Sequence, residues 1–250
     1  MKKYLYILIS ILILLILGVT IYILMPTRIP VLTYHDFVEG EPTNNMQINK
    51  DLFESEMKYL SKHNYKSLKL SDIDCFLDKK CKISKKSVLI TMDDGWLSEL
   101  EIAAPILKKY NLNAVIFYIG VNEDGHNEHF MSREDLETLN EKYPNIELAN
   151  HSYDLHHEED YLLDKEVFLS DLDKMKSIND SKYYAYPYGK YSDNYIESLK
   201  EMDYDLAFTF GPSKEHRKLD INDDRYKLPR LNVSNGMPMW KFILRLNWYK

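Results

Sequence analysis

A long apolar run stands at the beginning of the chain. Residues 4–25 contain no charged side chain, and 19 of these 22 residues are apolar. As a helix, this run would be roughly 33 Å long, which matches the hydrocarbon core of a bilayer. Lys2 and Lys3 precede the run and Arg28 follows it, so the positive-inside rule places the N-terminus in the cytoplasm. We therefore expect residues 1–30 to form a cytoplasmic stub and an uncleaved, single-pass membrane anchor.

A cleaved secretory signal is the alternative interpretation of this run. The apolar core of a signal is typically about 7–15 residues long and ends at small residues. The run in this chain is longer and ends in Ile23-Leu24-Met25-Pro26. These two features favour the anchor, with residues 31–250 as one extracellular domain at the cell membrane.

Beyond the anchor, short apolar runs typical of buried strands alternate with patterns typical of helices. This alternation predicts an α/β fold with a parallel sheet, and the number of elements fits a single distorted (β/α) barrel. The predicted strands are Val31–Tyr34, Tyr65–Leu70, Val88–Thr91, Ala114–Ile119, Ile146–Ala149, Tyr183–Tyr186 and Leu206–Phe210. The predicted helices are Asp51–His63, Leu97–Tyr110, a helix from the Ser132-Asp135 capping box to Pro144, Glu166–Ile178, Asp193–Met202 and Met237–Trp248.

The part of the chain beyond residue 30 is acidic. The whole chain has a formal net charge of -7, but the first 30 residues hold three basic side chains and no acidic one, so the remainder stands at -10. Such an acidic domain argues against a broad surface for nucleic acid.

Cys75 and Cys81 are the two cysteines, and outside the cytoplasm they could form a disulfide or remain two thiols.

Polar side chains directly follow four of the predicted strands. In a barrel of parallel strands, the carboxyl ends of the strands form the face that carries the chemistry. The residues at these ends are His35 and Asp36, Asp93 and Asp94, Asn150 and His151, and Tyr188. The set combines metal-ligand types with acid–base types, which predicts an active site at this face.

Two adjacent carboxylates leave a buried strand in the run Val88–Trp96. Successive side chains of a strand point to opposite sides, but a turn at Gly95 lets Asp93 and Asp94 reach one pocket in different roles. One carboxylate could bind a metal ion while the other stays free as a base. The alternative is an Asp-Asp-Gly turn that caps the following helix.

Three histidines lie in the segment Ala149–His157. On one helix, His151 and His156 would point about 140° apart, so these side chains need a loop to converge on an ion. Two imidazoles and the carboxylate of Asp94 would leave an open position for water or substrate, as in hydrolytic zinc sites. The segment alone also fits surface histidines in an acidic loop, and the presence of Asp94 favours the metal site.

Taken together, these motifs resemble those of the polysaccharide deacetylases, carbohydrate esterase family 4. The similar motifs are Asp93-Asp94-Gly95, the pair His151-Ser152 with His156, and Tyr186-Pro187-Tyr188-Gly189. The histidine spacing and the segment Thr33-Tyr34-His35-Asp36 are more similar to the branch that acts on poly-β-1,6-N-acetylglucosamine, in which the motif order is circularly permuted. The resemblance extends from about Val31 to Ser234.

The resemblance implies a metal-dependent hydrolase that removes acetyl groups from an N-acetylglucosamine-containing polysaccharide at the cell surface. It implies Zn²⁺ as the first choice of metal, with Co²⁺, Ni²⁺ and Fe²⁺ as alternatives. The implied ligands are Asp94, His151 and His156. By the same resemblance, Asp93 is the general base, His35 is the general acid, and the backbone N–H of Tyr188 stabilises the oxyanion. We expect the protein to act as a monomer.

One departure from the family pattern concerns an arginine. Many members carry an arginine two residues before the motif proline, where this chain has Ala185. We therefore expect Arg230 to orient the catalytic base. The alternative for Arg230 is an ordinary surface ion pair with Asp223 and Asp224.

A second departure is the absence of a C-terminal Leu-x-His motif. The permutation that places His35 on the first strand explains this absence, but a non-catalytic glycan-binding protein would also lack a motif. His35 itself could instead be a buried histidine held by Asp36. Among enzymes, a peptidoglycan N-acetylglucosamine deacetylase is the alternative.

Overall fold

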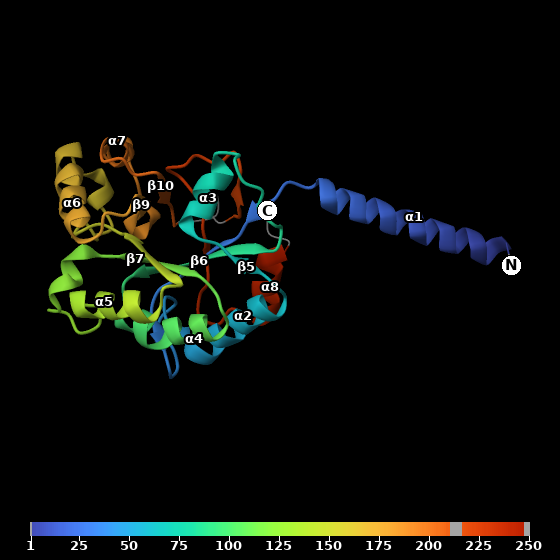
Figure 1. Cartoon of the computed structure of the whole chain (residues 1–250), viewed down its shortest axis with the longest axis horizontal. Coiled ribbons are helices and arrows are strands. Elements are labelled where there is room, and N and C mark those ends of the chain that lie inside the picture. Colours follow the sequence, from blue (N-terminus) through green and yellow to red (C-terminus); the bar gives the residue numbers. More distant parts are fainter. Residues whose placement is uncertain (1, 211–216, 248–250) are drawn as a thin grey trace.

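Strands and helices alternate along the computed structural model, which describes residues 2–210 and 217–247 (Figure 1). The strands are β1 (Arg28–Ile29), β2 (Val31–Tyr34), β3 (Phe37–Val38), β4 (Ile48–Asn49), β5 (Lys66–Ser67), β6 (Ser87–Asp94), β7 (Ala114–Tyr118), β8 (Ile146–Asn150), β9 (Tyr183–Ala185), β10 (Leu206–Phe208), β11 (Leu219–Asp220) and β12 (Leu231–Asn232). The α-helices are α1 (Lys2–Leu24), α2 (Lys50–Lys62), α3 (Leu70–Leu77), α4 (Ala104–Lys109), α5 (Arg133–Lys142), α6 (Lys165–Ile178), α7 (Asp193–Glu201) and α8 (Met239–Asn247).

An eight-stranded parallel sheet curls into a half-barrel at the centre of the fold. Its path is β10-β9-β8-β7-β6-β2-β12, and β5 pairs with the beginning of β6. The segment 228–232 connects the two edges of the sheet, because Leu228 pairs with Phe208 of β10 and Leu231 pairs with Leu32 of β2. The α/β prediction is confirmed, and the predicted barrel takes the form of this curled sheet.

Alternate residues of each strand face two different apolar clusters. On β6, Leu89 belongs to the cluster inside the curled sheet, whereas its neighbours pack beneath the helices. Thr33 of β2 and Thr91 of β6 are paired in register, and both are buried. Because side chains alternate with a period of two, His35 and Asp93, two positions further on, reach the same inner face.

The predicted strand Tyr65–Leu70 is too long, because a helix replaces its end. Only Lys66–Ser67 pairs with the sheet, and α3 follows almost at once. The carboxylate of Asp72 accepts the backbone N–H of Lys69 (3.0 Å) and so satisfies a free donor at the start of α3. This local hydrogen bond competes with strand pairing.

The predicted helix Leu97–Tyr110 is divided into a π-helical turn (Glu99–Ala103) and α4. Pro105, in the first turn of α4, has no N–H to donate to the preceding turn, which favours such a break. The capping box at Ser132 is confirmed at the start of α5. α8 confirms the predicted C-terminal helix, although Trp248 lies outside the described residues.

Cys75 and Cys81 form a disulfide, with their Cα atoms 5.4 Å apart. The bridge ties α3 to the loop that follows it. Of the two alternatives that the sequence left open, the disulfide is therefore the correct one. Disulfides are typical of proteins that fold outside the cytoplasm.

α1 points away from the rest of the chain (Figure 1). Across the residues that the structure describes, no helix has the length and apolar character needed to cross a membrane. The predicted anchor, residues 1–30, includes positions outside that description, namely Met1 and the side chains of residues 2, 3, 5, 8 and 21–24. The anchor therefore stays a prediction of the sequence.

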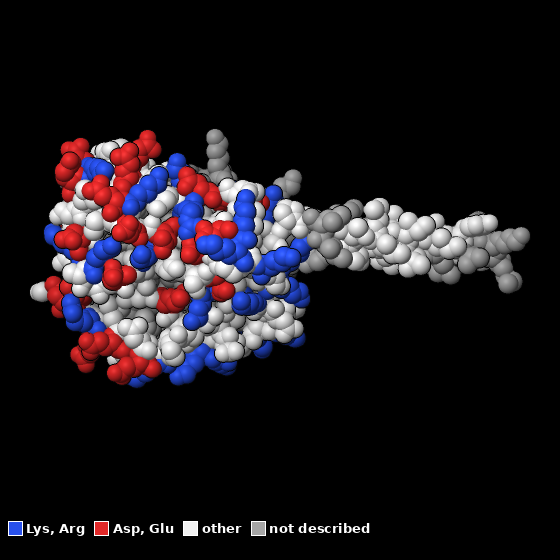
Figure 2. Space-filling model, turned by 45° about the horizontal axis from the view of Figure 1, so that its top comes forward, with Lys and Arg blue, Asp and Glu red and all other residues white. Residues whose placement is uncertain are grey.

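Charged side chains are spread unevenly along the long axis of the molecule. On the face shown in Figure 2, acidic side chains gather at the end far from α1, whereas Lys and Arg are frequent next to α1. On this face, the end far from α1 is thus the more acidic one.

Candidate active site

Asp94, His151 and His156, here called the ligand triad, meet at the carboxyl ends of β6 and β8. Asp94 Oδ1 lies 3.4 Å from His151 Nε2 and 3.1 Å from His156 Nε2. One potential ligand atom from each residue lies within 4.8 Å of the others. Ligands bonded at about 2.1 Å to a tetrahedral zinc ion lie roughly 3.4 Å apart. The ligand triad therefore fits a tetrahedral ion with one position left for another ligand.

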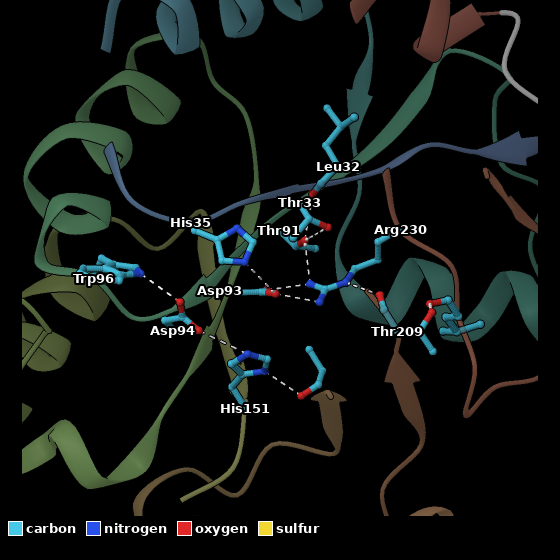
Figure 3. A network of polar contacts seen from close by, with 12 residues as sticks. Leu32, Thr33, His35, Thr91, Asp93, Asp94, Trp96, His151, Thr209 and Arg230 are labelled. Atoms are coloured by element: carbon cyan, nitrogen blue, oxygen red, sulfur yellow. Dashed lines mark hydrogen bonds and ion pairs between the residues drawn. The ribbon is translucent and has the colours of Figure 1, made fainter. Parts of the chain in front are cut away.

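Hydrogen bonds to atoms that point away from the other triad members orient His151 and Asp94. His151 Nδ1 lies 2.7 Å from the carbonyl oxygen of Ala185 and donates to it, so that the lone pair of Nε2 faces Asp94. Trp96 Nε1 donates to Asp94 Oδ2 (3.0 Å), which leaves Oδ1 for the histidines (Figure 3). The sequence predicts neither role, because a backbone carbonyl group carries no sequence signal and nothing in the run Val88–Trp96 marks the indole N–H as a partner of Asp94.

The backbone at these strand ends adopts conformations that few residues tolerate. Asp94 (φ 83°), Ser152 (φ 88°) and Tyr188 (φ 55°) are all in the left-handed region. Such non-glycine residues are uncommon and cluster at functional sites. Gly95 (φ 80°) completes the turn, and a Cβ at this position would lie 2.3 Å from the ring of Tyr118. The direction of Asp94 therefore depends on glycine at position 95.

Asp93 is buried beside the ligand triad and is bound by Arg230. Arg230 Nη1 and Nη2 donate to Asp93 Oδ1 and Oδ2, each at 2.7 Å (Figure 3). Burial alone would raise the pKa of Asp93, but the guanidinium of Arg230 together with His151 and His35 outweighs burial, and the pKa is lowered. The alternative of a surface pair with Asp223 and Asp224 is wrong, because Arg230 is 1% exposed and Asp223 binds Arg217.

Arg230 is itself held in one orientation. Its Nε donates to the carbonyl oxygen of Thr209 (2.8 Å), and Nη1 donates to Thr91 Oγ1 (3.4 Å). The guanidinium also lies 5.4 Å from the ring centroid of Phe117 and 5.8 Å from that of Phe210. A planar guanidinium with these contacts presents a fixed fork to a carboxylate.

His35 directly follows β2, and its side chain faces Asp93. Its Nε2 lies 3.9 Å from Asp93 Oδ2, an ion-pair distance beyond hydrogen-bond range. Burial lowers the pKa of His35 although the nearby carboxylates oppose this, so a neutral resting imidazole is favoured near pH 7. Asp36 does not hold His35, since its carboxylate accepts hydrogen bonds from Ser98 Oγ (2.7 Å) and Gln47 Nε2 (2.8 Å). That alternative for His35 is wrong.

Tyr188 lies beside His156 of the ligand triad. Its ring centroid is 5.1 Å from that of His156, and its side chain is half-exposed. At Gly189 (φ 67°), a Cβ would lie 1.7 Å from the carbonyl oxygen of Phe210, so only glycine fits there. The structure thus brings Tyr188 to the site, and the role of its backbone N–H stays a prediction.

Comparison with known proteins places this geometry in a family. The model of the family described as polysaccharide deacetylase matches residues 80–207. YxkH of Bacillus subtilis (strain 168), which carries the name of a polysaccharide deacetylase, is 30% identical over 218 residues, and the match covers 85% of this chain and 74% of YxkH. The chain belongs to the polysaccharide deacetylase family. It is therefore a hydrolase, and the alternative of a non-catalytic glycan-binding protein is set aside.

One further relative and two solved structures are similar to this deacetylase. The poly-beta-1,6-N-acetyl-D-glucosamine N-deacetylase of Staphylococcus aureus (strain MSSA476) is 29% identical over 213 residues, covering 80% of this chain and 72% of that protein. The Streptococcus pyogenes deacetylase PplD, solved with acetate, has a TM-score of 0.79 at 20% identity, covering 89% of this chain and 99% of its own. IcaB from Ammonifex degensii has a TM-score of 0.75 at 23% identity, covering 89% and 98%. The chain is a polysaccharide N-deacetylase that shares its fold with these two solved structures, and this family is metal-dependent.

In this deacetylase, Arg230→Met is expected to leave the buried carboxylate of Asp93 without its partner. Removing one member of a buried ion pair costs about 3–5 kcal/mol of unfolding free energy, which urea denaturation measures. Arg217→Met is the matched control, because it removes a partly exposed pair with Asp223 and should cost at most about 1 kcal/mol. Equal losses in the two variants would contradict the buried pairing.

Proposed function

We propose that this deacetylase removes N-acetyl groups from poly-β-1,6-N-acetylglucosamine and releases acetate. The observation that carries the proposal is the ligand triad beside a second carboxylate, Asp93, which Arg230 binds outside the triad. A metal site alone serves binding, whereas a separate buried carboxylate serves proton transfer. The name of the Staphylococcus aureus relative supports the choice of polymer.

The donor set of the ligand triad suits Zn²⁺, and it also accepts Co²⁺, Ni²⁺ or Fe²⁺. When bound, such an ion would polarise the acetyl carbonyl and lower the pKa of its water. Asp94, His151 and His156 would hold it through the three ligand atoms that already face one another.

Asp93 is the proposed general base, which takes a proton from the attacking water. The fork of Arg230 keeps the Asp93 carboxylate ionised and fixes its direction. A base held in this way contributes about 10²–10⁴-fold to the rate of such reactions. Arg230 acts through Asp93 and is a positioning residue.

His35 is the proposed general acid, which protonates the departing amine nitrogen. Without this proton, the tetrahedral intermediate would expel water again rather than the amine. His35 Nε2 lies 3.9 Å from Asp93 Oδ2. The proton that Asp93 takes up can therefore pass to the imidazole once the two side chains move within hydrogen-bond distance. A neutral resting His35 suits this transfer. The backbone N–H of Tyr188 would stabilise the negative charge on the carbonyl oxygen.

The proposal also places the enzyme at the cell surface. Residues 1–30 would tether the chain to the membrane, and residues 31–250 would lie outside the cell. The uncharged run of residues 4–25 and the Cys75–Cys81 disulfide support this location. The permuted motif order, with His35 on the first strand of the main sheet, supports membership of the branch that acts on poly-β-1,6-N-acetylglucosamine.

Acetate release from two defined substrates tests the choice of polymer. The zinc-loaded, full-length protein is incubated with β-1,6-linked or β-1,4-linked N-acetylglucosamine oligomers of equal length. We expect faster release from the β-1,6-linked series. Faster release from the β-1,4-linked series would overturn this choice and favour a peptidoglycan deacetylase.

A further inference from the structure

A buried carboxylate on α6 faces the loop that joins the two histidine ligands. Asp171 is 6% exposed and shares the inner side of α6 with Phe168, Leu172 and Met175. A carboxylate among apolar side chains is costly to bury unless hydrogen bonds satisfy it. The partners of Asp171 therefore show what the residue holds in place.

Three consecutive backbone N–H groups converge on this carboxylate. Tyr153 donates to Oδ2 at 2.9 Å, and Asp154 and Leu155 donate to Oδ1 at 2.9 and 3.3 Å. Successive N–H groups aimed at one anion form a nest, which fixes the local backbone. All three donors lie between His151 and His156 in the chain, so one side chain ties the connecting loop to α6.

The other edge of the loop is tied to the segment after β7. Gly120 and Val121 donate to the carbonyl oxygens of Ser152 (3.0 Å) and Tyr153 (2.7 Å). Gly120 packs so closely against α6 that a Cβ there would lie 2.8 Å from Met175 Sδ. The loop is thus clamped between this segment and α6, and Asp171 supplies the α6 side of the clamp.

His156 depends on this clamp more than His151 does. His151 directly follows β8, is almost fully buried, and is oriented by the carbonyl oxygen of Ala185. The side chain of His156 is 26% exposed, and it follows the clamped residues directly in the chain. The ring centroids of the two histidines are 5.2 Å apart. The residues that join the two histidines include the three whose backbone N–H groups bind Asp171.

We propose that Asp171 is a positioning residue that sets His156 against His151 and Asp94 and thereby raises the metal affinity of the site. The inference rests on the proposed assignment of the ligand triad. Asp171 reaches no ligand directly and acts through the backbone. Outer partners of metal ligands typically change metal affinity by about 10–100-fold.

The test compares Asp171→Asn with Asp173→Asn in the full-length protein. Asparagine keeps the size of the side chain but puts an NH₂ donor where a loop N–H needs an acceptor. Asp173 lies on the exposed side of α6, so its replacement removes the same charge without touching the loop. Competition with a chromophoric chelator should show Zn²⁺ affinity about 10–100-fold weaker for Asp171→Asn and unchanged for Asp173→Asn.

Further variants separate positioning from mere stabilisation. Asp171→Glu keeps a carboxylate and should recover part of the lost affinity, and the absorption spectrum of the Co²⁺-loaded Asp171→Asn protein should differ from the wild type. In a His156→Ala background, Asp171→Asn should cause no further loss of affinity. A lower unfolding temperature with unchanged Zn²⁺ affinity would overturn the positioning role.

The same series distinguishes the inference from the assignment on which it rests. If His156→Ala binds Zn²⁺ as tightly as the wild type, the assignment of the ligand triad is wrong, and the inference fails with it. If His156→Ala loses affinity while Asp171→Asn and Asp171→Glu do not, the triad stands and only the role of Asp171 is wrong.

Discussion

Asp93→Asn is expected to lower kcat/KM for acetate release by about 10²–10⁴-fold, the usual contribution of a general base. Asparagine has the size of aspartate but cannot take a proton from water. Because Asp93 lies outside the ligand triad, Zn²⁺ affinity should stay at the wild-type value. The experiment measures acetate release and Zn²⁺ binding on the same preparations, with circular dichroism to check the fold.

Asp124→Asn provides the control for this variant. Asp124 is a half-exposed side chain that pairs with His126, so its replacement removes one negative charge outside the ligand triad. It should leave both activity and Zn²⁺ affinity unchanged. If Asp93→Asn retains full activity, the base assignment is wrong; if it loses Zn²⁺ instead, Asp93 is a ligand.

His35→Ala is expected to lower deacetylation of N-acetylglucosamine oligomers by about 10²–10⁴-fold. Amine departure needs a proton on the nitrogen, and His35 is the acid placed nearest to Asp93. An ester such as 4-nitrophenyl acetate has a leaving group that departs without this proton. Its hydrolysis should therefore fall much less, so the ratio of the two activities is the measured quantity.

His126→Ala is the control for the acid, because His126 is highly exposed in a surface turn. Neither substrate should be affected in that variant. Equal losses on amide and ester in His35→Ala would mean that His35 maintains the site as a whole and does not act as the acid.

Much of the fold follows from the pattern of apolar residues. The buried strands and their alternation with helices are strong local signals, and these elements were predicted close to their observed places. The shared face of His35 and Asp93 is also a matter of strand periodicity, since each lies two residues beyond paired threonines in β2 and β6. The sequence was least informative where a local hydrogen bond or a proline ended an element early, as at Lys69 and Pro105.

Contacts between distant segments complete the site. The pairing of Arg230 with the base Asp93, which the missing arginine at Ala185 predicts, spans 137 positions because the segment 228–232 lies between the edges of the curled sheet. Other contacts carry no sequence signal. The carbonyl oxygens of Ala185 and Thr209 act through the backbone, which no residue type reveals. Asp171 is different, because an acidic residue on the apolar side of a helix is itself a signal that a buried partner exists.

Deacetylation by this protein is expected to depend on a metal ion that the ligand triad holds. The most direct measurement is acetate release from β-1,6-linked N-acetylglucosamine oligomers by the full-length protein before chelation, after it, and after metal is restored. We predict release that disappears when the metal is removed and returns with Zn²⁺ or Co²⁺. Release that persists after complete metal removal, or no release from the metal-loaded enzyme, would contradict the account.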